Sequence, residues 1–168
     1  MRGSSAQWSV RERIRVVVAD DHPLIRSGLA RLIAAEPDLE LVGTAADGVS
    51  AVEVAEREQP DVVVLDLSMP LLDGVTAAEE IGQRSPDVRV LVLSSYVQEV
   101  VVTSAFNAGV SGYLAKDVAA AEVLDGIRQT HAGGTPMSEG IRSMVPLADP
   151  RGLAERLADP PPRGQPDL

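Results

Sequence analysis

Short apolar runs alternate along this chain with longer segments in which apolar residues recur every three or four positions. Four of these runs end in a polar side chain that can handle a phosphate or a cation. They are Val16 to Ala19 before Asp20-Asp21, Val62 to Leu65 before Asp66, Val90 to Leu93 before Ser94, and Gly112 to Ala115 before Lys116. Continuous apolar runs of this length, three of them rich in β-branched valine, predict strands buried on both faces of a parallel sheet.

The remaining segments complete a regular alternation of strand and helix. A further strand is expected at 39–45, and helices at about 23–36, 49–58, 75–84, 99–108 and 119–132. Five strands and five helices joined by short loops predict an α/β, doubly wound parallel sheet. Among the strand orders that right-handed crossovers allow, 2-1-3-4-5 would place the ends of the first and third strands side by side.

The domain organisation follows from where this pattern begins and ends. Residues 1–13 are polar and unpatterned, which indicates a flexible N-terminal extension, and residues 14–132 form one domain. After Gly133-Gly134 the chain is rich in proline, so residues 133–168 are expected to be a linker or tail, with one short helix possible near 150–158.

The amino-acid composition excludes several classes of function. The net charge of −10 argues against nucleic-acid binding by this chain alone. The absence of cysteine excludes disulfides and thiolate sites. Because no apolar stretch approaches the length of a membrane span and the start has no signal-peptide pattern, no membrane contact is expected and the cytoplasm is the expected compartment. Lys116 is the only lysine beside fourteen arginines, which hints that its position needs a compact ammonium.

The polar residues at the strand ends are expected to meet, because parallel strands end along one edge. There Asp20, Asp21 and Asp66 would be three like charges, which need a neutralising partner. Magnesium suits such oxygen ligands and bridges readily to phosphate. The alternative for Asp20-Asp21 is a turn followed by a helix cap, and from these two residues alone the two interpretations are equally good.

Asp66 is the strongest candidate for covalent chemistry. It ends the most apolar strand, where no neighbour demands a turn carboxylate, and a carboxylate can accept a phosphoryl group. The Lys116 ammonium and the Ser94 hydroxyl would then contact the phosphoryl oxygens. Aspartate-based phosphatases of the haloacid dehalogenase type carry a second Asp two residues beyond the nucleophile. This chain has Ser68 there, so slow hydrolysis and a persistent phosphorylated form are expected.

Three stretches carry a family resemblance: VVVADDHP at 16–23, VVLDLSMPLLDG at 63–74 and AGVSGYLAKD at 108–117. They resemble the receiver domain of two-component response regulators, and most of all the NarL/FixJ group, whose output is a LuxR-type helix-turn-helix. The resemblance covers about residues 14–132 and implies a flavodoxin-like fold.

The resemblance implies a role for each matching residue. Asp66 would be the phosphoacceptor, and Lys116 would contact the phosphoryl group. Asp21 and Asp66 would bind Mg²⁺ directly, Asp20 largely through water, and Ser68 through its backbone carbonyl. Ser94 would be the switch hydroxyl, for which the adjacent Ser95 is the weaker candidate, and Tyr113 the aromatic that changes rotamer with it. His22 is expected to cap or pack at a helix start and not to be a ligand.

The resemblance also implies partners and a place in signalling. A sensor histidine kinase would supply the phosphoryl group, and phosphorylation would favour a homodimer. The 34 residues after Gly134 are too few for a helix-turn-helix domain of this class, so DNA binding and transcription regulation would need an output domain absent from this chain. We expect this sequence to be the receiver and linker trimmed from a longer regulator, or alternatively a naturally short one.

Three alternatives stay open. The protein could be an atypical receiver that acts by protein contacts without phosphorylation, or a phosphatase, against which Ser68 argues. A Rossmann-type nucleotide binder is disfavoured because no glycine-rich loop follows the first strand. The β-branched run at 100–103 lies within a predicted helix, against local propensity, and indicates either a helix held by packing or a marginal, switchable or interface helix.

Overall fold

Residues 12–69 and 72–145 are described by a computed structural model, whose centre is a five-stranded, entirely parallel sheet. The strands stand in the order β2-β1-β3-β4-β5, which confirms the predicted α/β, flavodoxin-like arrangement. Their bounds are β1 Ile14–Ala19, β2 Leu39–Ala45, β3 Val62–Leu65, β4 Arg89–Ser94 and β5 Gly112–Ala115.

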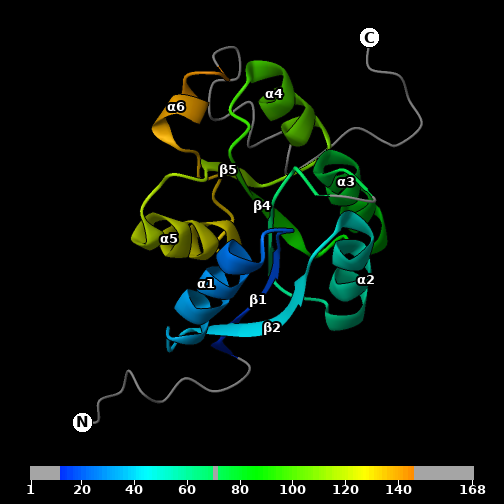
Figure 1. Cartoon of the computed structure of the whole chain (residues 1–168), viewed down its shortest axis with the longest axis vertical. Coiled ribbons are helices and arrows are strands. Elements are labelled where there is room, and N and C mark those ends of the chain that lie inside the picture. Colours follow the sequence, from blue (N-terminus) through cyan, green and yellow to red (C-terminus); the bar gives the residue numbers. More distant parts are fainter. Residues whose placement is uncertain (1–11, 70–71, 146–168) are drawn as a thin grey trace.

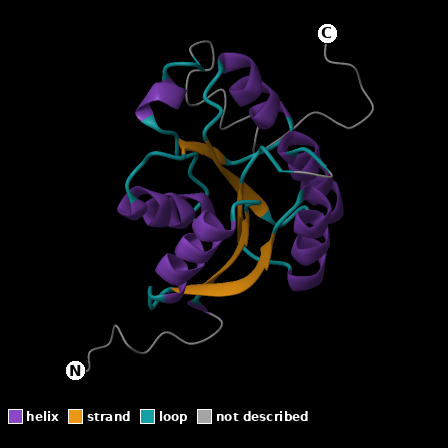
Figure 2. Ribbon diagram, in the orientation of Figure 1, coloured by secondary structure: helices purple, strands orange, loops and turns teal. Residues whose placement is uncertain are grey.

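Helices cover both faces of this sheet, as Figures 1 and 2 show. The helices α1 and α5 lie on one face, and α2, α3 and α4 lie on the other. Their bounds are α1 Pro23–Ala34, α2 Gly48–Glu58, α3 Gly74–Arg84, α4 Glu99–Asn107 and α5 Ala120–His131, close to the predicted ranges.

The core has two halves because successive strand residues point to opposite faces. In β1, Val16 and Val18 pack with α1 and α5, whereas Val17 and Ala19 pack with α2 and α3. All four are almost completely buried. Burial on both faces explains why the strands read as continuous aliphatic runs and not as alternating ones.

The loop after β3 is fixed by the start of α3. Asp73 caps this helix by accepting hydrogen bonds from the N–H and the hydroxyl of Thr76. A Cβ at Gly74 would lie 2.3 Å from Cα of Leu67 and 2.8 Å from the carbonyl oxygen of Asp66. Only glycine therefore lets α3 begin so close to Asp66 and Leu67, the two residues that follow β3.

The segment after α5 packs on the domain, although sequence analysis treated everything from residue 133 onward as linker or tail. Met137 forms a parallel bridge with Tyr113, and a sixth helix, α6 Glu139–Arg142, follows. Ile141 of α6 is fully buried in the same core half as α4. The proline-rich composition of the tail hid this short apolar anchor. Of the predicted extension at 1–13, residues 1–11 lie outside the described residues, as does the possible helix at 150–158.

The β-branched run in α4 divides between core and surface. Val102 is fully buried, Val101 is half-buried, and Val100 is 76% exposed. Packing of one side of the helix therefore accounts for Val102 but leaves Val100 without a structural role. Within the described part of the chain, no helix is both long and apolar enough to cross a membrane.

Arg128 ties α5 to the loop between α1 and β2. Its guanidinium reaches both carboxylate oxygens of Asp38, at 2.8 and 3.0 Å, and Glu36 at 2.6 Å. Hydrogen bonds from Arg128 are the main reason why the pKa of Asp38 lies below its ordinary value. A bidentate contact of this kind between a guanidinium and a carboxylate is stronger than an ordinary surface ion pair.

We expect Gly74→Ala and Gly82→Ala, two identical changes within α3, to have opposite effects. The first should destabilise the fold by about 1–3 kcal/mol because the new Cβ meets backbone. The second meets nothing within 4 Å and should be neutral or stabilising by up to about 1 kcal/mol, since alanine favours a helix. Urea denaturation measures both, and equal effects would contradict the close-approach explanation.

We expect Arg128→Met to lower the free energy of unfolding at pH 7 by about 1 kcal/mol, a figure that allows for solvent screening of a third-exposed side chain. Because the folded pKa of Asp38 is depressed, this contribution is present above the unfolded pKa of about 4 and lost as pH falls through the folded value. Thermal unfolding at pH 7 and pH 3 measures the change. Arg84→Met, which breaks only exposed pairs with Glu56 and Glu80, is the control and should change little.

Candidate functional site

The polar residues that follow the strands are held in place because the ladder of backbone hydrogen bonds continues beyond the strands. The N–H of Asp20 donates to Ala45, that of Asp66 to Ala19, and that of Lys116 to Ser94, at 2.9–3.0 Å. Each of these three residues is therefore as firmly placed as the strand before it. The sheet edge predicted from sequence brings them together.

Asp20 and Asp66 are buried carboxylates, each 2% exposed, that share one ammonium. Nζ of Lys116 lies 2.9 Å from Oδ2 of Asp20 and 3.2 Å from Oδ2 of Asp66. The second contact is an ion pair, and Oδ2 of Asp66 has no other partner among the described residues. Its Oδ1 accepts the N–H of Ser68 at 3.3 Å.

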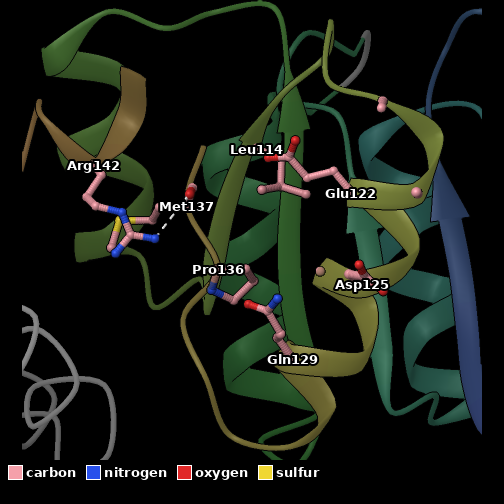
Figure 3. Close-up of a pocket in the computed structure, with 10 residues that line it drawn as sticks. Leu114, Glu122, Asp125, Gln129, Pro136, Met137 and Arg142 are labelled. Carbon is pink, nitrogen blue, oxygen red and sulfur yellow. Dashed lines mark hydrogen bonds between the residues drawn. The ribbon is translucent and has the colours of Figure 1, made fainter. Parts of the chain in front are cut away.

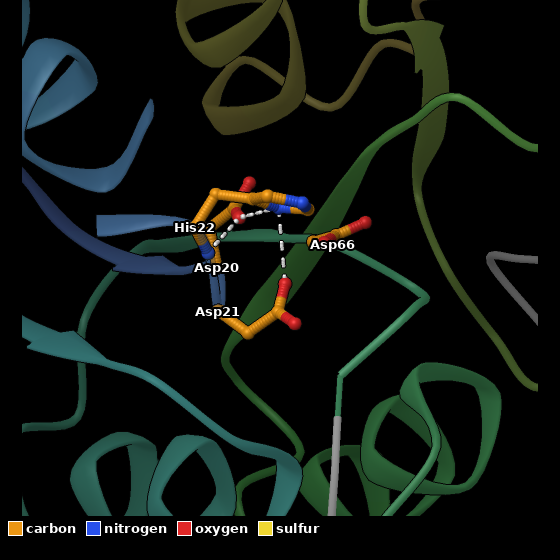
Figure 4. Close-up of side chains that lie close together, drawn as sticks. All are labelled: Asp20, Asp21, His22 and Asp66. Carbon is orange, nitrogen blue, oxygen red and sulfur yellow. Dashed lines mark hydrogen bonds and ion pairs between the residues drawn. The ribbon is translucent and has the colours of Figure 1, made fainter. Parts of the chain in front are cut away.

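Asp21 and His22 complete a compact group at the mouth of this site (Figure 4). One potential ligand atom from each of Asp20, Asp21, His22 and Asp66 lies within 4.8 Å of the others. Nδ1 of His22 lies 3.1 Å from Oδ1 of both Asp20 and Asp21. His22 occupies the cap position of α1 but makes no side-chain cap, so its imidazole faces the carboxylates, which sequence analysis did not anticipate.

This donor set fits a hard divalent cation. Three carboxylates converge, and the buried Oδ1 of Asp21 and Oδ2 of Asp66 have no partner among the described residues beyond their ion pairs with His22 and Lys116. Oxygens left in this condition are costly unless a cation or another donor satisfies them. The carboxylates thus suit magnesium, as predicted.

The electrostatics show that one ammonium does not fully offset two buried carboxylates. Burial is the main reason why the pKa of Asp66 lies above its ordinary value, and the nearby charge of Asp20 raises this pKa further. The hydrogen bond from the Ser68 N–H and the charge of Lys116 act in the opposite direction. Burial alone would lower the pKa of Lys116, but its contacts with Asp20 and Asp66 outweigh that effect and raise it. Lys116 therefore stays charged while Asp66 is left short of neutralising charge.

Ser94 and Tyr113 are linked through the backbone of Tyr96. Oγ of Ser94, which is fully buried, accepts the N–H of Tyr96 at 3.0 Å. The fully buried Tyr113 donates its hydroxyl to the carbonyl oxygen of Tyr96. Burial raises the pKa of the Tyr113 phenol above its ordinary value, so it remains a neutral donor. The neighbouring Ser95 is exposed, which favours Ser94 as the buried hydroxyl of this edge.

A separate cavity of about 390 Å³ opens between α5 and residues 136–142. None of the residues predicted for the phosphoryl and cation site lines it. Ser68 contributes its N–H to Asp66, while the predicted role of its carbonyl stays a prediction. The contacts of His22 and the bridging role of Tyr96 are not predictable from sequence, because neither residue type signals them at these positions.

Comparison with known proteins agrees with this geometry. Residues 16–128 match the family model of the response regulator receiver domain. The chain is 42% identical over 122 residues to the transcriptional regulatory protein DegU of Brevibacillus brevis, covering 73% of this chain and 52% of DegU. It is 35% identical over 137 residues to the nitrate/nitrite response regulator protein NarL of Escherichia coli (strain K12), covering 82% of this chain and 63% of NarL. The chain thus spans about half to two thirds of the length of these relatives.

Solved structures give the same result. A LuxR-family two-component response regulator from Aurantimonas sp. SI85-9A1 superposes with a TM-score of 0.76 at 33% identity, covering 80% of this chain and 96% of that one. The signal receiver domain of the putative response regulator NarL from Mycobacterium tuberculosis superposes with a TM-score of 0.70 at 35% identity, covering 73% and 98%. With the fold, the acidic edge and the sequence matches in agreement, this chain belongs to the response regulator receiver domain family and is of the NarL/LuxR type.

Proposed function

We propose that this protein is a phosphorylation-controlled switch in which Asp66 accepts a phosphoryl group. The observation that carries this proposal is the placement of Asp66: it is buried, fixed by the ladder, and its Oδ2 lies 3.2 Å from the Lys116 ammonium with no other partner among the described residues. Such an oxygen is a nucleophile held beside a positive charge.

The chemistry is a displacement at phosphorus. An oxygen of Asp66 forms the new bond to phosphorus while the bond from phosphorus to the donor breaks, and the donor leaves with that electron pair. Lys116 contacts the phosphoryl oxygens, and the Ser94 hydroxyl donates a hydrogen bond to one of them. The raised pKa of Asp66 makes its carboxylate more basic, which favours attack once it is ionised.

Asp21 and Asp66 would hold a Mg²⁺ ion directly, with the Ser68 carbonyl as a further ligand and Asp20 acting largely through water. The ion supplies positive charge that neutralises the carboxylates and the incoming phosphoryl oxygens together. His22 faces the same carboxylates, with Nδ1 3.1 Å from Oδ1 of Asp20 and of Asp21.

We propose a regulator and not an enzyme that turns over a substrate. A phosphatase needs a general acid or base beside the phosphorylated carboxylate, and the residue two positions on is Ser68. We propose a sensor histidine kinase as the donor, formation of a homodimer on phosphorylation, and control of transcription through an output domain outside this sequence. Two relatives support this assignment: DegU is named a transcriptional regulatory protein, and NarL is named a response regulator protein.

We expect incubation with Mg²⁺ and acetyl phosphate to add one phosphoryl group to the chain, detected by intact mass. Asp66→Asn should abolish the adduct because the amide is not a nucleophile toward phosphorus. Asp87→Asn, which changes an exposed acid, should retain it.

An adduct that survives in Asp66→Asn would place the phosphoacceptor elsewhere. No adduct in the folded wild-type protein would contradict the proposal and favour a receiver that acts by protein contacts without phosphorylation.

We expect Mg²⁺ to stabilise the folded protein through the carboxylates. At a concentration ten times the dissociation constant, the gain should be about 1.4 kcal/mol, measured by thermal unfolding. Asp21→Asn should lose most of this gain, since it removes one ligand charge. Asp125→Asn, on the exposed side of α5, is the matched control and should keep the full gain. Equal Mg²⁺ responses in both variants would rule out Asp21 as a ligand.

A further inference from the structure

The segment after α5 pairs with the edge of the sheet at the residue that is the expected aromatic switch. The N–H of Tyr113 donates to the carbonyl of Pro136 at 2.9 Å, and the N–H of Ser138 donates to the carbonyl of Tyr113 at 3.2 Å. A Cβ at Gly112 would lie 2.7 Å from the carbonyl oxygen of Pro136, so the approach depends on glycine. Both backbone groups of Tyr113 are therefore committed to this segment.

Ser138 adds a contact that its position in the helix does not require. It stands at the cap position of α6 but makes no side-chain cap. Instead its Oγ, in a side chain that is almost fully buried, accepts the N–H of Ala115 at 2.9 Å. A serine at a helix start that bonds to a neighbouring strand joins the two elements and does not serve the helix.

The side chains of this segment share a core with the Tyr113 ring. Ile141 and Tyr113 are both fully buried in the same cluster, against which Met137 and Met144 also pack. If the ring swung outward, it would leave a void in that cluster, and a void costs contacts on every side. Burial of the ring and docking of the segment therefore favour each other.

On its other side the segment is poorly held. The cavity of about 390 Å³ separates it from α5, with Pro136, Met137 and Arg142 on one wall and Glu122, Asp125 and Gln129 on the other (Figure 3). Arg142 donates to the carbonyl of Met137 within the segment itself and not across the cavity. The attachment thus depends on the β5 side, where Tyr113 lies.

We propose that residues 136–145 form a latch on β5 whose docking is coupled to burial of the Tyr113 ring, and that phosphorylation closes it. The second half of this inference rests on the proposed role of Asp66. A phosphoryl group that takes the Ser94 hydroxyl as a donor fixes that side chain, whose oxygen holds the Tyr96 N–H. The Tyr96 carbonyl, which receives the Tyr113 hydroxyl, is thereby fixed as well, and the buried ring holds the latch to the sheet.

The test uses the full chain and two readouts. Deuterium uptake by peptides covering 136–145 is compared before and after phosphorylation with acetyl phosphate and Mg²⁺, with intact mass as the measure of the adduct. The Tyr113 ring is followed by ¹⁹F NMR after incorporation of 3-fluorotyrosine, with Tyr96→Phe to assign the two tyrosines. Ser138→Ala removes the hydroxyl that accepts the Ala115 N–H. Ser143→Ala, which removes a hydroxyl that donates to Gly140 within the same segment, is the matched control.

We expect uptake over 136–145 to become about fivefold slower on phosphorylation in the wild type and in Ser143→Ala, and to change less than about twofold in Ser138→Ala. Without phosphorylation, Ser138→Ala should shift the Tyr113 resonance toward that of an exposed ring, and Ser143→Ala should not. Ile141→Val, a smaller change in the same latch, replaces Ser138→Ala if that variant does not fold.

Unchanged uptake in a sample whose mass shows the adduct would overturn the closing of the latch. Failure to form any adduct would instead count against the proposed function of Asp66. The ¹⁹F NMR comparison of the variants would then still test the coupling between the latch and the Tyr113 ring. If Ser138→Ala left the Tyr113 resonance unchanged, the proposed coupling between latch docking and burial of the ring would be wrong.

Discussion

The main physical constraint in this structure is a pair of buried carboxylates that share a single ammonium. Asp20 and Asp66 are held one residue beyond adjacent strands by backbone hydrogen bonds, so they cannot move apart to relieve their repulsion. Lys116 lies closer to Asp20 than to Asp66. The edge of the sheet therefore carries less positive than negative charge. A divalent cation or a phosphoryl group would each change this balance and, with it, the electrostatic environment of the neighbouring side chains.

The sheet makes this constraint possible because its strands are aliphatic and buried on both faces. A buried parallel ladder is stiff, and stiffness lets unfavourable charge persist where a flexible loop would relax. Gly74 serves the same end: the absence of a Cβ lets α3 begin directly against Leu67, so the loop that carries Asp66 is braced by a helix. Stability of the core is in this sense a condition for the chemistry at its edge.

Sequence predicted the parts of the molecule that depend on local pattern. The strands followed from continuous aliphatic runs, the helices from periodic ones, and the meeting of Asp20, Asp66 and Lys116 from the rule that parallel strands end together. What sequence could not supply were contacts between segments with no local signal. The role of Ser138 is an example, since a serine before a short helix normally predicts a cap, and only the three-dimensional approach to Ala115 reveals its partner.

The same reasoning explains why the residues after α5 matter to the rest. An edge strand leaves one row of backbone groups unpaired, and natural sheets cover such edges. Here the cover reaches Tyr113, whose ring fills the core and whose hydroxyl bonds to the Tyr96 backbone beside Ser94. Residues 136–138 are thus attached to the sheet through Ala115 and through Tyr113, whose hydroxyl also bonds to Tyr96 in the loop after β4. Under the proposed function, a phosphoryl group on Asp66 would act on residues 136–145 through these contacts.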